Sequence, residues 1–183
     1  MAIVDQKQPR KGRGASFNPN NRFAPTHSEA EDDGWWQEKQ PTRLATVVSN
    51  EQARSALAWN DSPDLGFDRS LNPYRGCEHG CIYCYARPSH AYWDMSPGLD
   101  FETRLIARSG LVERLREELC KPRYACRPIV LSGNTDCYQP LEAERGTTRE
   151  LLAFLLECRH PVSIITKSAL ILRDLDLLTE LAR

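Results

Sequence analysis

The chain has 183 residues, of which 40% are hydrophobic and 27% are charged, and its formal net charge is −1. This composition supplies enough apolar side chains for a core, and it excludes the overall positive field that draws basic proteins onto nucleic acid or anionic membranes. No apolar run reaches the roughly 18 residues of a membrane helix, and the first residues lack the apolar stretch of a signal peptide. We therefore expect a cytoplasmic protein with no membrane partner, whose seven cysteines are reduced thiols available for metal or redox chemistry.

The first part of the chain differs in composition from the rest. Residues 1–42 are rich in Gly, Pro, Asn, Gln and charge without a sustained hydrophobic period, which predicts a disordered leader. Residues 43–183 are predicted to fold, with a core that starts at about residue 66. Within them, the stretch DFETRL (100–105) alternates between polar and apolar residues, which predicts an extended segment.

Three amphipathic helices are predicted in the second half of the chain. The first spans residues 110–120, where leucines recur every four residues. The second is opened by Thr147, with Glu150 three residues later as a capping box, and it ends before Pro161. The third carries apolar residues at helical spacing over residues 171–182.

Two short apolar, β-branched runs between these helices, residues 127–133 and 161–167, predict buried strands. Strands that alternate with helices indicate βαβ units and a parallel sheet, so the expected fold class is α/β. About three βα units are visible, and three units leave a long hydrophobic edge at the last strand. We therefore interpret residues 43–183 as the N-terminal part of a larger domain.

The segment LNPYRGCEHGCIYCYARP (71–88) places Cys77, Cys81 and Cys84 in the pattern C-x3-C-x2-C. Thiolates are ligands of zinc and of iron–sulfur clusters. A structural zinc site needs four ligands, typically from paired C-x2-C motifs, whereas this segment offers a single triplet. Three close thiolates suit a four-iron cluster in which one iron stays open to a substrate or cofactor. Gly76 and Gly80 allow the loop to wrap closely around such a cluster.

This segment resembles the cluster loop of radical S-adenosylmethionine (SAM) enzymes, in which an aromatic residue, here Tyr83, precedes the third cysteine. Its NPYRGC lead and CYAR tail are more similar to the branch related to spore photoproduct lyase, a DNA repair enzyme. The resemblance covers about residues 66–183. It implies a partial (β/α)6 TIM-like barrel, here truncated after about three βα units, with the cluster loop after the first strand.

The resemblance also implies an activity. A [4Fe-4S] cluster on the three cysteines would bind SAM, and one electron from a reductant such as flavodoxin or ferredoxin would cleave it to methionine and a 5′-deoxyadenosyl radical. The radical would abstract a hydrogen atom, and a nucleic-acid base is the candidate substrate of this lyase-like enzyme.

Further site residues follow from the resemblance and from the rule that ligands gather at the carboxyl ends of barrel strands. Ser132, Gly133 and Asn134 lie where the strand 127–133 ends, at the place where the superfamily positions the amino group of SAM, and Asp136 is a further acceptor. Lys167 lies at the end of the strand 161–167, and the resemblance implies that it neutralises the methionine carboxylate. Equally, Asn134 and Asp136 suit an ordinary turn, and Lys167 suits a solvated surface.

Three more predictions concern the cysteine loop and its surroundings. The resemblance implies that Tyr83 and Tyr85 face the adenosine moiety, although tyrosines beside a cluster can also serve in packing. Spore photoproduct lyase returns a hydrogen atom from a cysteine that aligns with Gly133 here, so Cys137 is the nearest substitute donor. Arg87 and His90 could contact the substrate or could belong to an exposed loop.

Two other functions remain open from the sequence. One is a non-enzymatic zinc-binding module whose fourth ligand is His79 or a distant cysteine. The other is an inactive, truncated radical SAM fragment, because a catalytic radical needs shielding from solvent that three βα units do not supply.

Overall fold

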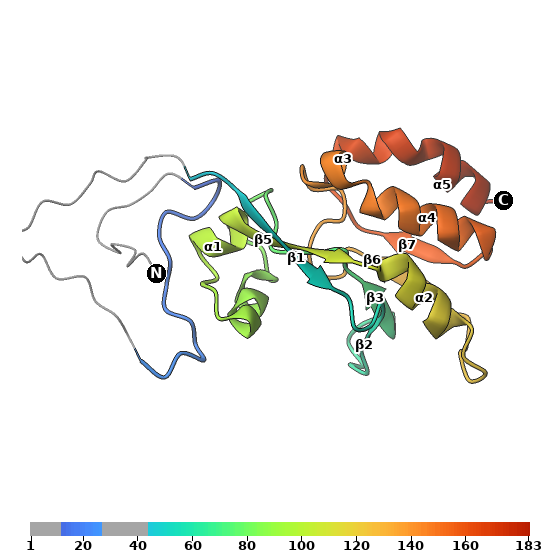
Figure 1. The fold of residues 1–183 in the computed structure, drawn as a ribbon, viewed down its shortest axis with the longest axis horizontal. Helices are drawn as coiled ribbons and strands as arrows, with labels where there is room; N and C mark the ends of the chain where they lie inside the picture. The colour runs from blue at the N-terminus through green and yellow to red at the C-terminus, as the bar shows by residue number, and fades with distance from the viewer. Residues whose placement is uncertain (1–11, 27–43) are drawn as a thin grey trace, which may run out of the picture. The chain divides into compact units, whose positions relative to one another are not determined.

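The computed structural model describes residues 12–26 and 44–183, and its ribbon is shown in Figure 1. Contacts divide the chain into two compact units. We call them unit 1 (Met1–Val48 and Gly76–Leu105) and unit 2 (Ser49–Arg75 and Ile106–Arg183). Of the predicted leader, residues 1–11 and 27–42 lie outside the described residues, and residues 12–26 contain no helix or strand.

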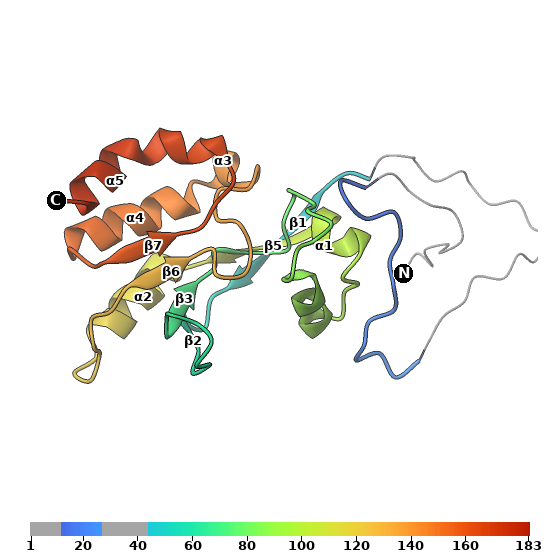
Figure 2. The same cartoon turned by 180° about the vertical axis from the view of Figure 1, so that it is seen from behind.

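Unit 2 contains a four-stranded sheet in which three consecutive strands are parallel. Its order is β2-β3-β6-β7. The parallel pairs have the registers Leu71↔Leu131 and Leu131↔Ile164, whereas β2 is antiparallel to β3. The view from behind in Figure 2 shows β3, β6 and β7 side by side. The strands are β2 (Ala58–Trp59), β3 (Arg69–Leu71), β6 (Ile129–Leu131) and β7 (Val162–Ile164).

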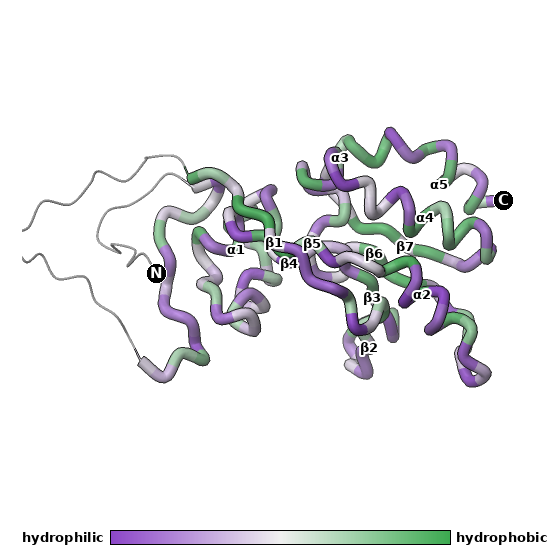
Figure 3. The backbone as a smooth tube through the Cα atoms, viewed as in Figure 1, coloured by the Kyte–Doolittle hydropathy of each residue, from purple (hydrophilic) through white to green (hydrophobic). Residues whose placement is uncertain are grey.

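The predicted strands at 127–133 and 161–167, and their parallel pairing, are thus confirmed, although both strands are shorter than expected. The prediction that both are buried holds for β6 and is wrong for β7, in which Val162 and Ile164 are half-buried and Ser163 is exposed. The apolar side chains of both strands join those of the helices in one apolar core. Leu71, Ile129 and Leu131 are completely buried there. Figure 3 shows the hydrophobic residues along β6 and β7. Burial of each such side chain favours folding by about 1.5–3 kcal/mol, so this core is the main stabilising feature of unit 2.

The predicted helices at 110–120 and from Thr147 are confirmed, but one predicted cap is wrong. The predicted helix over 171–182 is a 3-10 helix as far as Asp174 and an α-helix only from Leu175. The helices of unit 2 are α2 (Leu111–Leu119), α3 (Glu142–Arg145), α4 (Thr147–Glu157), the 3-10 helix η2 (Ala169–Asp174) and α5 (Leu175–Leu181). The residue that caps α4 is Gly146, with φ +68°, rather than Thr147. The N–H of Thr148 lies in the first turn of α4, where backbone donors have no partner within the helix, and it donates to the Glu142 carboxylate at 3.0 Å. A residue outside α4 thus takes the place of the predicted capping box.

A smaller sheet has the order β1-β5-β4. It comprises β1 (Val47–Gln52), β4 (Tyr74–Arg75) and β5 (Arg104–Ser109). β4 and β5 are antiparallel, with Tyr74 opposite Ala107. Both described sheets are open. None of the helices in the described part of the chain is long and apolar enough to cross a bilayer.

Unit 1 contains the 3-10 helix η1 (Arg87–Trp93) and the short helix α1 (Leu99–Thr103). The prediction of an extended segment over residues 100–105 is therefore wrong for its first four residues. The alternation misled because Glu102 is as fully buried as its neighbour Phe101, so the polar positions of this stretch do not mark a solvent-facing side.

Candidate functional site

The three clustered cysteines all lie in unit 1, on the loop that connects β4 to η1. Cys77 is buried, Cys81 and Cys84 are half-buried, and all three are free thiols. The backbone turns at successive cysteines: the N–H of Gly80 donates to the Cys77 carbonyl at 3.4 Å, and the N–H of Cys84 donates to the Cys81 carbonyl at 3.2 Å. We call residues 76–86 the cysteine loop.

Two glycines give the cysteine loop a backbone that other residues rarely adopt. Gly76 has φ +75° and Gly80 has φ +62°. A Cβ at Gly76 would lie 2.9 Å from the Phe101 carbonyl oxygen and 2.8 Å from Leu105 Cδ2. The two glycines are therefore required by the backbone of the loop and by its close approach to other protein residues, and the expected wrapping around a cluster stays a prediction.

The cysteine loop is attached to α1 by an apolar contact and by an arginine. Cys77 packs with Ala86 and Phe101, and its N–H donates to the Phe101 carbonyl at 2.9 Å. Arg87 donates through Nε to the Cys81 carbonyl at 3.0 Å and through Nη2 to Glu102 at 2.5 Å. Arg87 thus fixes the loop backbone at the second cysteine.

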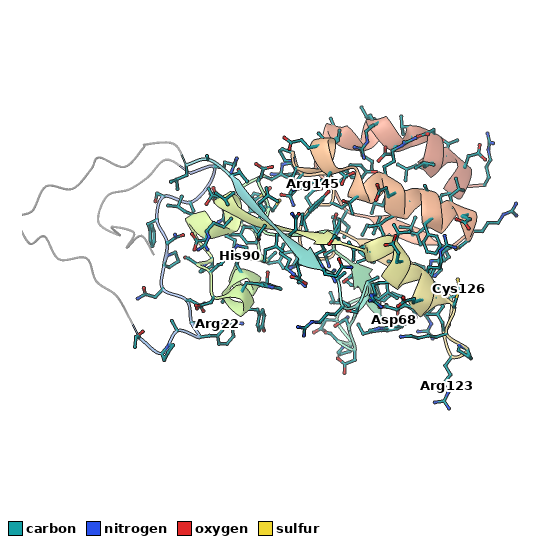
Figure 4. All side chains as sticks on the ribbon, viewed as in Figure 1. Arg22, Asp68, His90, Arg123, Cys126 and Arg145 are labelled. Atoms are coloured by element: carbon teal, nitrogen blue, oxygen red, sulfur yellow. The ribbon has the colours of Figure 1, made fainter. Side chains whose placement is uncertain are left out.

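Neither Arg87 nor His90 belongs to an exposed loop. The Arg87 side chain is 12% exposed, and His90 is fully buried with its Nε2 3.0 Å from the Arg104 carbonyl oxygen. Figure 4 labels His90 among the side chains of unit 1. Burial lowers the pKa of His90, so the ring is neutral near physiological pH. Both residues therefore have structural contacts that the sequence did not indicate.

The aromatic residues beside the third cysteine are on the surface. Tyr83 is 80% exposed, Tyr85 is 76% exposed, and Ile82 next to them is 77% exposed. Most of the surface of these three side chains is therefore accessible to solvent. Their predicted contact with adenosine stays a prediction.

The donor set of the cysteine loop fits an iron–sulfur cluster. Among the described residues, no group of three or more His, Cys, Asp or Glu side chains is arranged to hold a single metal ion. In a cubane cluster each thiolate binds a different iron, so the three sulfurs need not converge on one point. The three free thiols of this loop are the residues that would hold such a cluster, and the cluster itself stays a prediction.

The other predicted site residues lie in unit 2, after β6 and β7. Ser132 has φ +68°, is buried, and accepts the Cys137 N–H on its Oγ at 2.7 Å. Asn134 donates its N–H to Asn72 Oδ1 at 2.8 Å, and a Cβ at Gly133 would lie 2.9 Å from Ser70 Cβ. The segment after β6 therefore lies close to the end of β3, where Gly133 allows close approach.

Asp136 and Lys167 meet at the carboxyl ends of β6 and β7. The Asp136 carboxylate accepts from Thr166 Oγ1 at 2.7 Å, from the Tyr138 N–H at 2.8 Å and from the Lys167 N–H at 3.2 Å. The structure thus brings these two predicted residues together through the backbone of Lys167. Asp136 has a structural role here, since it joins the two strand ends.

Cys137, the predicted hydrogen donor, belongs to the core of unit 2. Its side chain is completely buried, and burial raises the pKa of its thiol to about 12. A role as hydrogen donor would require the thiol to become accessible from this position, and it stays a prediction.

A buried polar network in unit 2 was not foreseen from the sequence. Glu142 accepts from Tyr74 Oη at 2.5 Å and from Arg173 Nη2 at 2.7 Å. Asp174 accepts from Arg149 Nη1 at 2.8 Å and from Tyr138 Oη at 3.1 Å. Because the partners come from segments far apart in the chain, no local pattern could have indicated it; it joins α3, α4 and η2.

Comparisons with known proteins give relatives but no function. The chain is 40% identical over 119 residues to the uncharacterized protein Rv2578c of Mycobacterium tuberculosis, covering 65% of this chain and 35% of the relative. It is 31% identical over 107 residues to the uncharacterized protein MJ0683 of Methanocaldococcus jannaschii, covering 58% of this chain and 38% of the relative. The chain thus spans little more than a third of the length of these curated relatives. No protein-family model and no solved structure matches it.

Proposed function

We propose that this chain is the N-terminal part of a radical SAM protein of the spore photoproduct lyase-like branch. The observation that carries the proposal is the C-x3-C-x2-C triplet of free thiols on one glycine-turned loop. The parallel strands β3, β6 and β7, neighbours in one sheet, are compatible with the first three strands of a partial (β/α)6 barrel, although β4 and β5 lie between β3 and β6 in the chain. The cysteine loop begins directly after β4, the short strand that follows β3.

Each predicted residue has a task in this proposal. Cys77, Cys81 and Cys84 would hold the [4Fe-4S] cluster, with one iron free of protein ligands. When bound, the cluster would supply the electron that cleaves SAM to methionine and a 5′-deoxyadenosyl radical. The exposed rings of Tyr83 and Tyr85 would cover the adenosine moiety.

The strand-end residues would bind the methionine part of SAM. The segment Ser132–Asn134 would contact its amino group, and the Lys167 ammonium would neutralise its carboxylate. Asp136 would act indirectly, because its carboxylate fixes the backbone of Lys167.

The wider setting is part of the same proposal. A cytoplasmic reductant of the flavodoxin or ferredoxin type would supply the electron, and a nucleic-acid base is the proposed substrate. A reduced compartment agrees with seven free thiols in the described residues.

Anaerobic reconstitution with iron and sulfide tests the proposal. We expect about four irons and four sulfides per chain, and a reduced-state electron paramagnetic resonance spectrum that changes when SAM is added. Cys81→Ser should abolish iron binding, whereas Cys126→Ser, which changes an exposed cysteine of unit 2, should leave it intact. A colourless protein that holds one zinc and ignores SAM would instead establish the zinc module. A cluster that binds SAM without cleaving it would indicate an inactive fragment.

A further inference from the structure

Residues 12–15 are bound by one buried carboxylate of α1. Glu102 accepts the N–H of Arg13 at 2.6 Å, the N–H of Gly14 at 3.0 Å and the N–H of Ala15 at 2.7 Å. Its side chain has no exposed surface. A buried carboxylate is strongly unfavourable unless hydrogen bonds and a counter-charge compensate it, so Glu102 depends on these donors.

The Glu102 carboxylate is also connected to the cysteine loop, through Arg87. Arg87 donates to Glu102 and, through Nε, to the Cys81 carbonyl. One guanidinium therefore links the Glu102 carboxylate to the backbone of a cysteine in the candidate cluster site. Since both ends of this link are largely buried, its geometry is more strongly fixed than that of a surface ion pair.

Residues 12–15 also touch the cysteine loop directly. A Cβ at Gly14 would lie 1.8 Å from the Gly80 carbonyl oxygen, and a Cβ at Gly80 would lie 2.4 Å from Arg13 Cβ. Gly80 lies between Cys77 and Cys81. The two backbones are close enough that only glycine fits at both positions.

The Arg13 side chain adds a second attachment. It donates through Nη1 to the Glu102 carbonyl at 2.6 Å and through Nη2 to Glu78 at 3.1 Å. Glu78 is the residue after Cys77. Further along, Asn18 and Asp100 form a reciprocal pair, in which each accepts a hydrogen bond of 2.9 Å from the other. Residues 13–18 are therefore attached at both ends, by Arg13 and by Asn18.

We propose that Glu102 is the positioning residue of the cysteine loop and that residues 12–15 are a strap that covers the loop at Gly80. The strap fixes Cys77 and Cys81 from one side while Arg87 fixes Cys81 from the other. That the loop holds a cluster rests on the proposed function, but the strap belongs to the metal-free chain and is testable without iron.

The test is the alkylation rate of each cysteine by iodoacetamide in the reduced, metal-free, full-length chain, followed by mass spectrometry. Glu102→Gln removes the carboxylate charge, and Gly14→Ala displaces the strap while leaving Glu102 intact. Both should accelerate alkylation of Cys77 and Cys81 several-fold. Gly66→Ala is the matched control, because a Cβ there meets nothing within 4 Å.

The remaining cysteines report on unit 2 in the same experiment. Cys120, Cys126 and Cys158 are exposed and should react at unchanged rates, and Cys137 should stay protected. Figure 4 shows Cys126 near the loop that follows α2, far along the chain from the strap. If Glu102→Gln unfolds the protein, Cys137 becomes reactive, and Gly14→Ala then decides the outcome.

Wild-type rates at Cys77 and Cys81 in both folded variants would overturn the proposal. Iron content is measured separately. If both substitutions accelerate alkylation of Cys77 and Cys81 but the chain binds no iron, the strap is supported and the proposed function is refuted. If the chain binds iron but neither substitution changes these alkylation rates, the proposed function is supported and the strap is refuted.

Discussion

Different kinds of contact stabilise the interior of each unit. Unit 2 has a continuous apolar core that contains β3, β6 and residues of α2 and α4. In unit 1, the cysteine loop rests on a small apolar cluster around Phe101 and on the carboxylate of Glu102. Because apolar burial is spread over many residues whereas the Glu102 contacts converge on one, a single substitution should act globally in unit 2 and locally in unit 1.

The largest effect on stability is expected from the core of unit 2. Leu155→Ala removes a completely buried side chain and should lower the free energy of unfolding by about 3 kcal/mol, from lost burial plus the cavity left behind. Urea unfolding measures it. Leu172→Ala, at a residue that is 62% exposed, is the control and should change stability by at most about 0.5 kcal/mol. Equal effects of the two substitutions would contradict the assignment of the core.

The polar network of unit 2 should give the next largest effect. Asp174→Asn removes the charge of one buried carboxylate that pairs with both Arg149 and Arg173, and it should cost about 2–3 kcal/mol. The cost stays below that of breaking a fully buried pair because both arginines are partly exposed and keep a second carboxylate, Asp176 for Arg149 and Glu142 for Arg173. Chemical denaturation checks this, with the exposed Asp64→Asn as the matched control. An unchanged midpoint would mean that the apolar core alone fixes η2.

A glycine of the cysteine loop should show the local behaviour expected of unit 1. Gly76→Ala places a Cβ in a left-handed conformation, which costs about 1–2 kcal/mol, and within 2.9 Å of the Phe101 carbonyl oxygen. We expect faster alkylation of Cys77 while Cys137 stays protected. Gly66→Ala again provides the comparison, and a global loss of stability would break the distinction between the two units.

The same contrast explains how much of the fold the sequence could predict. In unit 2, the leucines of α2 and the apolar runs of β6 and β7 repeat with the period of the element that buries them, so their positions were predicted. The cap of α4 was not predicted, because Gly146 and Glu142, which lies in the preceding helix α3, replace Thr147 and Glu150. In α1, periodicity failed because Glu102 is buried by ion pairing.

Only part of the candidate site could be predicted from the sequence, for the same reason. Spacing alone singled out Cys77, Cys81 and Cys84 as candidate ligands, because residues on one short loop are neighbours in sequence as well as in space. The residues that support that loop are not neighbours: Arg13 and Glu102 are separated by 89 positions, and neither belongs to a motif. Asp136 was predicted as a ligand, yet its contacts hold two strand ends together. A polar residue type at a strand end therefore does not by itself distinguish a ligand from a residue that joins two strand ends.

The smallest predicted effect concerns acid. The hydrogen-bonded Arg149 guanidinium lowers the pKa of Asp176 from 3.8 to about 2. A carboxyl whose pKa is lower in the folded state stabilises the fold above its ordinary pKa and loses that contribution as pH falls toward the folded value. Stability should therefore decline between about pH 4 and pH 2, and Asp176→Asn should remove a small part of that decline.

The effect of Asp176 is small because its side chain is 58% exposed and water screens the pair. Denaturation midpoints of the wild type and of Asp176→Asn across this range measure it, with Asp64→Asn to subtract the general effect of removing a surface carboxylate. Hydrogen exchange would locate the loss. We expect it in η2 and α5, because Arg149 of α4 contacts both Asp174 and Asp176, and protection of β6 should change little. A decline that Asp176→Asn leaves intact would assign the acid sensitivity of this region to Asp174, whose pKa is also lowered: burial opposes that shift, and the hydrogen bonds from Arg173 and Arg149 outweigh it.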